Sequence, residues 1–162
     1  ATDSFDDDGR PSLLCRRQQH HGVAVEVELS FAPEAGEEAG LIVFYNAAHY
    51  AALLVVNDGE GPRWQLRKRI KSLVQRQDLG PAGIDWHRLA IHADPERFRF
   101  FIPFANESED PVGSIETALL STECVGLGFT GVFFGLYAHA PLTPARPACF
   151  RRFRYTPREA SP

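Results

Sequence analysis

Strict alternation of apolar and polar side chains from Val23 to Phe31 is the feature of this sequence that most constrains its fold. The apolar residues occupy every second position: Val23, Val25, Val27, Leu29 and Phe31. The positions between them hold small or polar residues: Ala24, Glu26, Glu28 and Ser30. A period of two residues places one set on each face of a β-strand. The pattern is typical of an antiparallel sheet with one buried face and one face in water.

Further segments have the composition of strands bounded by turn-forming residues. They cover residues 40–46, 50–58, 87–93, 97–103, 131–140 and 149–155. Segment 63–77 also alternates as a strand pair, although some of its apolar residues recur at helical spacing. Its neighbours favour the strand pair. Many short strands separated by turn signals predict an all-β fold, an antiparallel β-sandwich or jelly roll.

The size and charge of the chain limit its domain organisation and its partners. With 162 residues, it is expected to form an acidic N-terminal lead (1–10), one β-sandwich domain (11–156) and a C-terminal tail (157–162). The net charge of −4 argues against nucleic acid or an anionic membrane as partner. No apolar run approaches the ~20 residues of a membrane-spanning helix, so no membrane association is expected.

Cysteine and methionine usage bear on the origin of the chain. Cys15, Cys124 and Cys149 are widely spaced and odd in number, which predicts neither a disulfide framework nor a cysteine metal site. The sequence contains no methionine, so we expect a fragment or processed domain of a longer protein. No signal peptide is visible, and a cytoplasmic location is expected.

Two carboxylates on one strand raise the question of catalysis. Glu26 and Glu28 lie two residues apart, so their carboxylates fall within the roughly 5–10 Å that separate the acid and nucleophile of glycosidases. The simpler interpretation is the wet face of an antiparallel sheet, which the lack of interleaved aromatic residues favours. No other catalytic motif is present, so the chain alone is predicted to carry no catalytic residues.

Two charged runs have similar alternatives. The acidic stretch Asp3 to Asp8 offers oxygen ligands for calcium, but a flexible acidic terminus explains it as well, and no metal site is assigned. The basic row Arg63, Arg67, Arg69 and Lys71 is able to follow a polyanion. On a net acidic chain, a solvated strand face is the favoured interpretation.

Four strings together resemble a known family. They are "PSLLCRRQQHH", "EEAGLIVFYN", "LLSTE" and "GFTGVFFGLYA". In this order and spacing they are similar to the C-terminal concanavalin A-like domain of glycoside hydrolase family 43, the β-xylosidases and α-L-arabinofuranosidases. The similarity runs from about Pro11 to Tyr155.

The resemblance implies an accessory role beside a catalytic domain. In the family, a five-bladed propeller holds the catalytic carboxylates, and the sandwich packs on it and lends a phenylalanine to the rim of the pocket. That residue corresponds to Phe129 in "GLGFTG", where the glycines allow a projecting loop. The partners implied are the propeller and a xylo- or arabino-saccharide, with homo-oligomerisation left open and no cofactor required. A buried core position for Phe129 and a freestanding lectin-like carbohydrate-binding module are the alternatives.

The segment after "PSLLC" is unusually polar. Arg16, Gln18 and His20 point one way along a strand, and Arg17, Gln19 and His21 point the other way. A polar seam against the propeller, or the lining of a concave sheet, fits this segment better than a free loop, because guanidinium groups bridge acceptors across interfaces. The chain departs from the family at its last strand, where "ACFRRFRY" has arginines in place of acidic residues.

Overall fold

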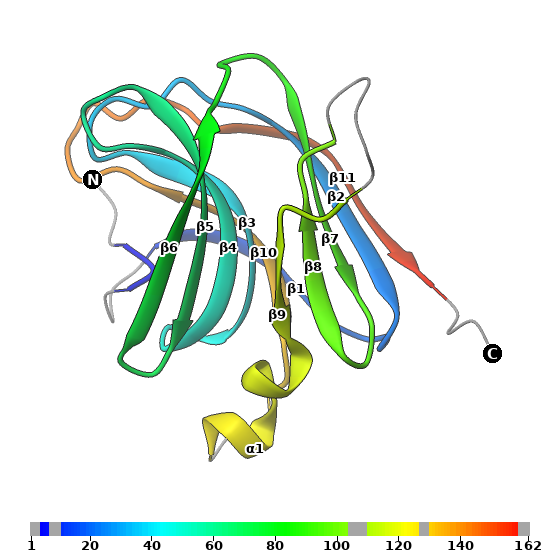
Figure 1. Ribbon diagram of the computed structural model, residues 1–162. Helices are drawn as coiled ribbons and strands as arrows, with labels where there is room; N and C mark the ends of the chain where they lie inside the picture. The colour runs from blue at the N-terminus through cyan, green and yellow to red at the C-terminus, as the bar shows by residue number, and fades with distance from the viewer. Residues whose placement is uncertain (1–3, 7–10, 104–109, 127–129, 159–162) are drawn as a thin grey trace.

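The computed structural model describes residues 4–6, 11–103, 110–126 and 130–158, which form two antiparallel sheets (Figure 1). The six-stranded sheet contains, in spatial order, β1 (Ser12–Arg17), β10 (Phe133–His139), β3 (Glu38–Asn46), β4 (His49–Asn57), β5 (Pro62–Ile70) and β6 (Leu73–Pro81). The five-stranded sheet contains β11 (Cys149–Pro157), β2 (Val23–Ser30), β7 (His87–Ala93), β8 (Arg97–Phe101) and β9 (Gly113–Glu116). The predicted all-β sandwich is confirmed.

The main core lies between the two sheets and uses the alternating positions. In β2, Val23, Val25, Val27 and Leu29 are at most 1% exposed. They belong to one apolar cluster with residues of both sheets, among them Leu53 of β4. Each such side chain stabilises the fold by roughly 1.5–3 kcal/mol relative to exposure. The alternation at 23–31 therefore places one face of β2 in the core between the two sheets.

The six-stranded sheet also buries part of its outer face. A second apolar cluster contains Phe5, Ile42, Tyr50, Ala52, Leu54 and Tyr137. Strands β3 and β4 are consequently covered on both sides, which agrees with their continuous apolar composition.

Segment 63–77 forms the strand pair that its alternation favours. Strand β5 pairs with β6 up to Ile70 opposite Leu73, and Lys71 and Ser72 form the turn between them. Trp64 and Leu66 of β5 enter the main core, at 2% and 0% exposure. The helical spacing in this segment has no structural counterpart.

One end of the sandwich, called here the α1 end, carries two short helical segments (Figure 1). They are the 3-10 turn η1 (Thr117–Leu120) and the helix α1 (Thr122–Val125). Ser121 joins them, and its hydroxyl accepts a hydrogen bond of 3.4 Å from the backbone N of Cys124. Leu120 is fully buried and closes the core at this end. No helix in the described part of the chain is long and apolar enough to cross a membrane.

Candidate functional site

Four parts of the chain that are distant in sequence surround a hollow at the α1 end. The hollow has a volume of about 330 Å³. Its lining comes from the polar segment after β1, from the end of β3, from η1 and α1, and from the residues before β10. These are Gln18, Gln19, His20, His21, Tyr45, Thr117, Leu120, Ser121, Thr122, Glu123, Gly131 and Val132. Hydroxyl, amide and imidazole groups dominate the lining, so it suits neutral hydrogen-bonding groups.

The polar segment leaves the sheet before it reaches the hollow. Strand β1 ends at Arg17, so the strand alternation expected for Gln18 to His21 does not apply. The backbone N of Gln18 donates to the carbonyl of Val132 at 2.8 Å, and its side-chain amide donates to the carbonyl of His20 at 2.8 Å. These bonds fix a turn that directs four polar side chains toward the α1 end.

Tyr155 on β11 anchors the polar segment to the opposite sheet. Its hydroxyl accepts a hydrogen bond of 2.9 Å from the backbone N of Gln19 and lies 3.3 Å from Nδ1 of His20. The guanidinium of Arg16 lies over the Tyr155 ring, 4.2 Å from its centre, a cation–π geometry. Part of the polar segment therefore makes contacts within this domain, because it joins the end of β1 in one sheet to β11 in the other.

The glycine-rich loop begins at Gly126, directly after α1, and ends at Gly131, which lines the hollow. Gly126 and Gly131 have φ values of +96° and +74°, a region that L-residues rarely adopt. These glycines fit the tight turns expected at both ends of the loop. Phe129, the expected rim residue, lies outside the described residues.

Tyr45 is a residue of the hollow that sequence reasoning missed. It is 7% exposed, and its hydroxyl has no hydrogen-bond partner among the described residues. Its position at the apolar end of β3 gave no signal, because the string "IVFYN" is typical of a core strand. Thr117, Ser121 and Thr122 were missed for a related reason, since short helical turns leave little periodicity to detect.

Glu26 and Glu28 lie on the outer face of the five-stranded sheet, and the carboxylate of each forms ion pairs with arginines. Arg88 and Arg154 pair with Glu26, and Arg151 and Arg152 pair with Glu28. The hydrogen bond from Arg151, assisted by Arg152, holds the pKa of Glu28 below its usual value. A general acid needs a raised pKa, so this carboxylate is unsuited to that role.

The wet-face interpretation of the two glutamates is thus confirmed. It also explains the arginines of the last strand, which form ion pairs across β11 and β2. On this solvent-accessible face, such pairs add little to stability, because water screens them.

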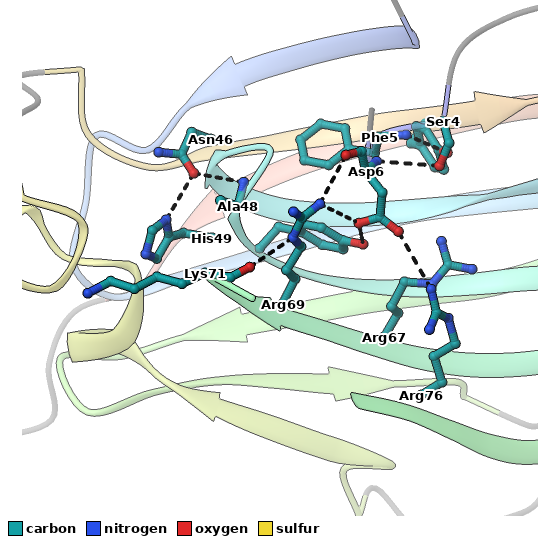
Figure 2. A network of polar contacts seen from close by, with 12 residues as sticks. Ser4, Phe5, Asp6, Asn46, Ala48, His49, Arg67, Arg69, Lys71 and Arg76 are labelled. Carbon is teal, nitrogen blue, oxygen red and sulfur yellow. Dashed lines mark hydrogen bonds and ion pairs between the residues drawn. The ribbon is translucent and has the colours of Figure 1, made fainter. Parts of the chain in front are cut away.

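Three arginines of the basic row lie on β5 and form ion pairs, whereas Lys71 lies exposed in the turn that follows β5. Arg67 is 7% exposed, and its guanidinium donates to both carboxylate oxygens of Glu38, at 3.0 and 2.6 Å. Arg63 pairs with Asp78, and Arg69 pairs with Asp6 (Figure 2). The expectation of a solvated row is wrong for Arg67, because the outer face of this sheet is covered there.

Part of the acidic N-terminal stretch is structured. Phe5 is 5% exposed, and Asp6 accepts hydrogen bonds from Tyr50 and Arg69. A flexible terminus does not describe these two residues. Asp3, Asp7 and Asp8 lie outside the described residues. Within the described ranges, no group of three or more histidine, cysteine or acidic side chains could hold a metal ion.

Comparisons with known proteins agree with the fold. The chain matches, over residues 1–156, the family model described as the beta xylosidase C-terminal concanavalin A-like domain. It is 33% identical over 140 residues to the non-reducing end alpha-L-arabinofuranosidase BoGH43B of Bacteroides ovatus, covering 83% of this chain and 26% of that protein. It is 27% identical over 153 residues to a beta-xylosidase of Bacillus subtilis, covering 89% of this chain and 29% of that protein.

A solved structure supports the same relationship. The crystal structure of xylan beta-1,4-xylosidase from Bacillus halodurans C-125 superposes with a TM-score of 0.85 at 25% identity, covering 96% of this chain and 31% of that one. The chain thus spans less than a third of the length of these relatives. Because the family model matches residues 1–156, nearly the whole chain, the chain belongs to the C-terminal concanavalin A-like domains of glycoside hydrolase family 43 xylosidases and arabinofuranosidases.

Proposed function

We propose that this sandwich packs through its α1 end on a catalytic five-bladed propeller and completes the substrate pocket of that propeller. The observation that carries the proposal is the hollow at the α1 end, where polar side chains gather beside the glycines that flank Phe129. The substrate is a xylo- or arabino-saccharide, and Phe129 contributes an apolar contact at the pocket rim.

The relatives support a division of labour between two domains. They are an arabinofuranosidase and two xylosidases, and this chain matches less than a third of each. In this arrangement, the catalytic carboxylates belong to the preceding domain. The sandwich adds binding and water exclusion, which raise the fraction of productive complexes without proton transfer.

The lectin-like alternative finds less support in the aromatic side chains. A sugar-binding platform needs exposed rings on which pyranose faces stack. Among the described residues, the exposed aromatic side chains are Trp86 and Phe153, at 41% and 39%. Trp86 is already covered by the guanidinium of Arg151, 3.8 Å from its ring centre. The rings on the outer face of the six-stranded sheet are buried by Phe5.

The proposal is tested by blocking the α1 end in the longer enzyme. Thr122 is exposed on the first turn of α1, so Thr122→Arg places a long cation at the expected contact. We expect kcat/KM for an aryl xyloside or arabinoside to fall about tenfold or more, the effect of ~1.4 kcal/mol.

The matched control is Glu60→Arg, in the exposed turn between β4 and β5 at the opposite end of the sandwich. It should leave kcat/KM unchanged, and both variants should keep the wild-type Tm as isolated chains. Equal kinetics for Thr122→Arg and the wild type would overturn the α1 end as the docking surface.

A further inference from the structure

The seat of Phe5 on the six-stranded sheet is built by three strands. Its ring makes edge contacts with Phe44 of β3, Tyr50 of β4 and Tyr137 of β10, with ring centres 5.1, 5.0 and 5.9 Å apart. The side chain is 5% exposed. Edge-to-face packing of this kind adds ~0.5–1.5 kcal/mol per pair beyond the burial itself. The ring therefore holds its position as firmly as a core residue does.

Polar groups of residues 5 and 6 are bound at the same place. The backbone N of Phe5 donates to the Tyr137 hydroxyl at 3.0 Å, and the Tyr50 hydroxyl donates to Oδ1 of Asp6 at 2.6 Å. Arg69 donates to the carbonyl and to Oδ1 of Asp6, at 3.0 and 3.2 Å (Figure 2). Ring, backbone and carboxylate are thus each recognised by a separate group of the sheet.

The recognising groups are themselves held in place. The Tyr137 hydroxyl donates to Oε1 of Glu38 at 2.6 Å, and Nη1 and Nη2 of Arg67 each donate to one oxygen of the Glu38 carboxylate. Burial, together with Asp6, raises the pKa of Tyr50, so its hydroxyl remains a proton donor to Asp6. The seat is a fixed set of donors and rings rather than an adaptable surface.

The seat adjoins the strand that leads from the α1 end. Phe44 stacks on Phe133 with ring centres 5.6 Å apart and planes 22° apart. Phe133 is the first residue of β10, two positions after Gly131, where the glycine-rich loop ends. Packed rings thus connect Phe5 to the base of the loop beside the hollow.

We propose that Phe5 and Asp6, called here the latch, bind the N-terminal segment that leads into the sandwich to the outer face of the six-stranded sheet. The inference rests on the proposed function, because the entering chain in the longer enzyme comes from the catalytic domain. By fixing that chain close to the α1 end, the latch sets the orientation in which the sandwich meets the catalytic domain. Phe5 and Asp6 are positioning residues and make no contact with substrate.

The latch is tested first in the chain as it stands. Asp6→Asn removes the charge that Arg69 and Arg76 face and leaves the size of the side chain unchanged. We expect hydrogen exchange at the Phe5 amide to accelerate about tenfold or more, as ~1.4 kcal/mol of lost interaction gives. The matched control is Asp78→Asn, which breaks an exposed pair with Arg63 on the same sheet. It should leave the Phe5 amide unchanged, and equal exchange in both variants would overturn the latch.

The role of the latch in orienting the sandwich is tested in the longer enzyme with Asp6→Asn and Phe5→Leu. We expect KM to rise about threefold or more in both, with kcat little changed, since a misoriented sandwich weakens binding but not proton transfer. Asp78→Asn again serves as the control. Unchanged kinetics with accelerated exchange would overturn the role of the latch in orienting the sandwich.

The failure of this inference and the failure of the proposed function give different results. An effect of Asp6→Asn on KM without an effect of Thr122→Arg on kcat/KM would support the latch and reject the α1 end as the docking surface.

Discussion

Glu38 and Arg67 form the most deeply buried ion pair of the described residues, at 8% and 7% exposure. Burial alone would raise the pKa of Glu38, but the hydrogen bonds from Arg67 outweigh it and hold the pKa below its usual value. Opposite charges in contact repay their desolvation only when the geometry is good and other donors are satisfied. Here the pairing is bidentate, and Tyr137 satisfies a further lone pair.

Breaking this pair on one side should be costly. Glu38→Gln leaves the guanidinium of Arg67 buried without a counter-charge, so we expect the free energy of unfolding to fall by ~3–5 kcal/mol. In the double variant Glu38→Gln with Arg67→Met, the glutamine oxygen still accepts from Tyr137 and no charge is left buried. Urea unfolding should show that the double variant recovers most of the loss. A double variant less stable than Glu38→Gln alone would contradict this account.

The same pair predicts a pH dependence. Because the pKa of Glu38 is lower in the folded state than in the unfolded chain, its contribution is fully present above the unfolded value, about pH 4.3. It is lost as the pH falls through the lower folded value. We therefore expect stability to decline less steeply in the double variant than in the wild type as the pH falls below about 4.3. Parallel Tm curves in this interval would contradict the assignment.

Phe129 allows the proposed rim role to be separated from a core role. In the longer enzyme, Phe129→Ala should lower kcat/KM by about one to two orders of magnitude, because a rim ring contributes contact and positioning. The Tm of the variant should stay near the wild type. A core ring would instead cost ~3–5 kcal/mol of stability, and a large fall in Tm with unchanged kinetics would show that Phe129 is a core residue.

Residue-level burial was the part of the structure that the sequence could not supply. Arg67 lies on the polar side of its alternating strand, and it is buried as the partner of Glu38, which is far away in the chain and also binds Tyr137. Glu26 and Glu28 were predictable, because their face meets solvent and local alternation suffices there. A partner brought in by tertiary structure leaves no periodic trace.

Among the elements, the β5–β6 hairpin carries local backbone strain. Lys71, the first residue of its two-residue turn, has φ +56°, which costs an L-residue roughly 1–2 kcal/mol. Lys71→Gly removes that strain, at an entropic cost of ~0.5–1 kcal/mol. We expect a net gain of ~0.5–1 kcal/mol and a Tm higher by about 1–4 °C. Ser72→Gly is the matched control and should destabilise the hairpin, because Ser72 has no positive φ. Equal shifts from both variants would contradict this explanation.

Elements with a long alternating pattern were predictable, and short ones were not. The strand pair at 63–77 followed from alternation and from its all-β neighbours. The turns η1 and α1 have four residues each, too few for a helical period to show. These turns line the hollow, so part of the candidate site became visible only in three dimensions.

At the scale of the whole molecule, the arrangement predicts that this chain is inactive alone. The Glu26 and Glu28 carboxylates are held by arginines, and most described aromatic rings are buried. We expect no hydrolysis of aryl xylosides or arabinosides by the isolated chain, and no binding of xylo-oligosaccharides by calorimetry. Turnover that disappears in Glu26→Gln would restore a catalytic role. Saturable binding at micromolar to low millimolar concentration would favour a lectin-like module.

The edge strand β11 restricts how this domain combines with others. Its pairing with β2 is interrupted between Arg151 and Arg154, and Arg152 there adopts φ +55°. A sheet grows into a neighbouring molecule only along a regular row of backbone donors and acceptors, and a bulge lined with like charges breaks that row. Copies of this domain at high concentration are therefore not expected to polymerise by strand pairing along β11. At this edge, a neighbouring domain in the same enzyme can therefore lie beside the five-stranded sheet without adding a strand to it.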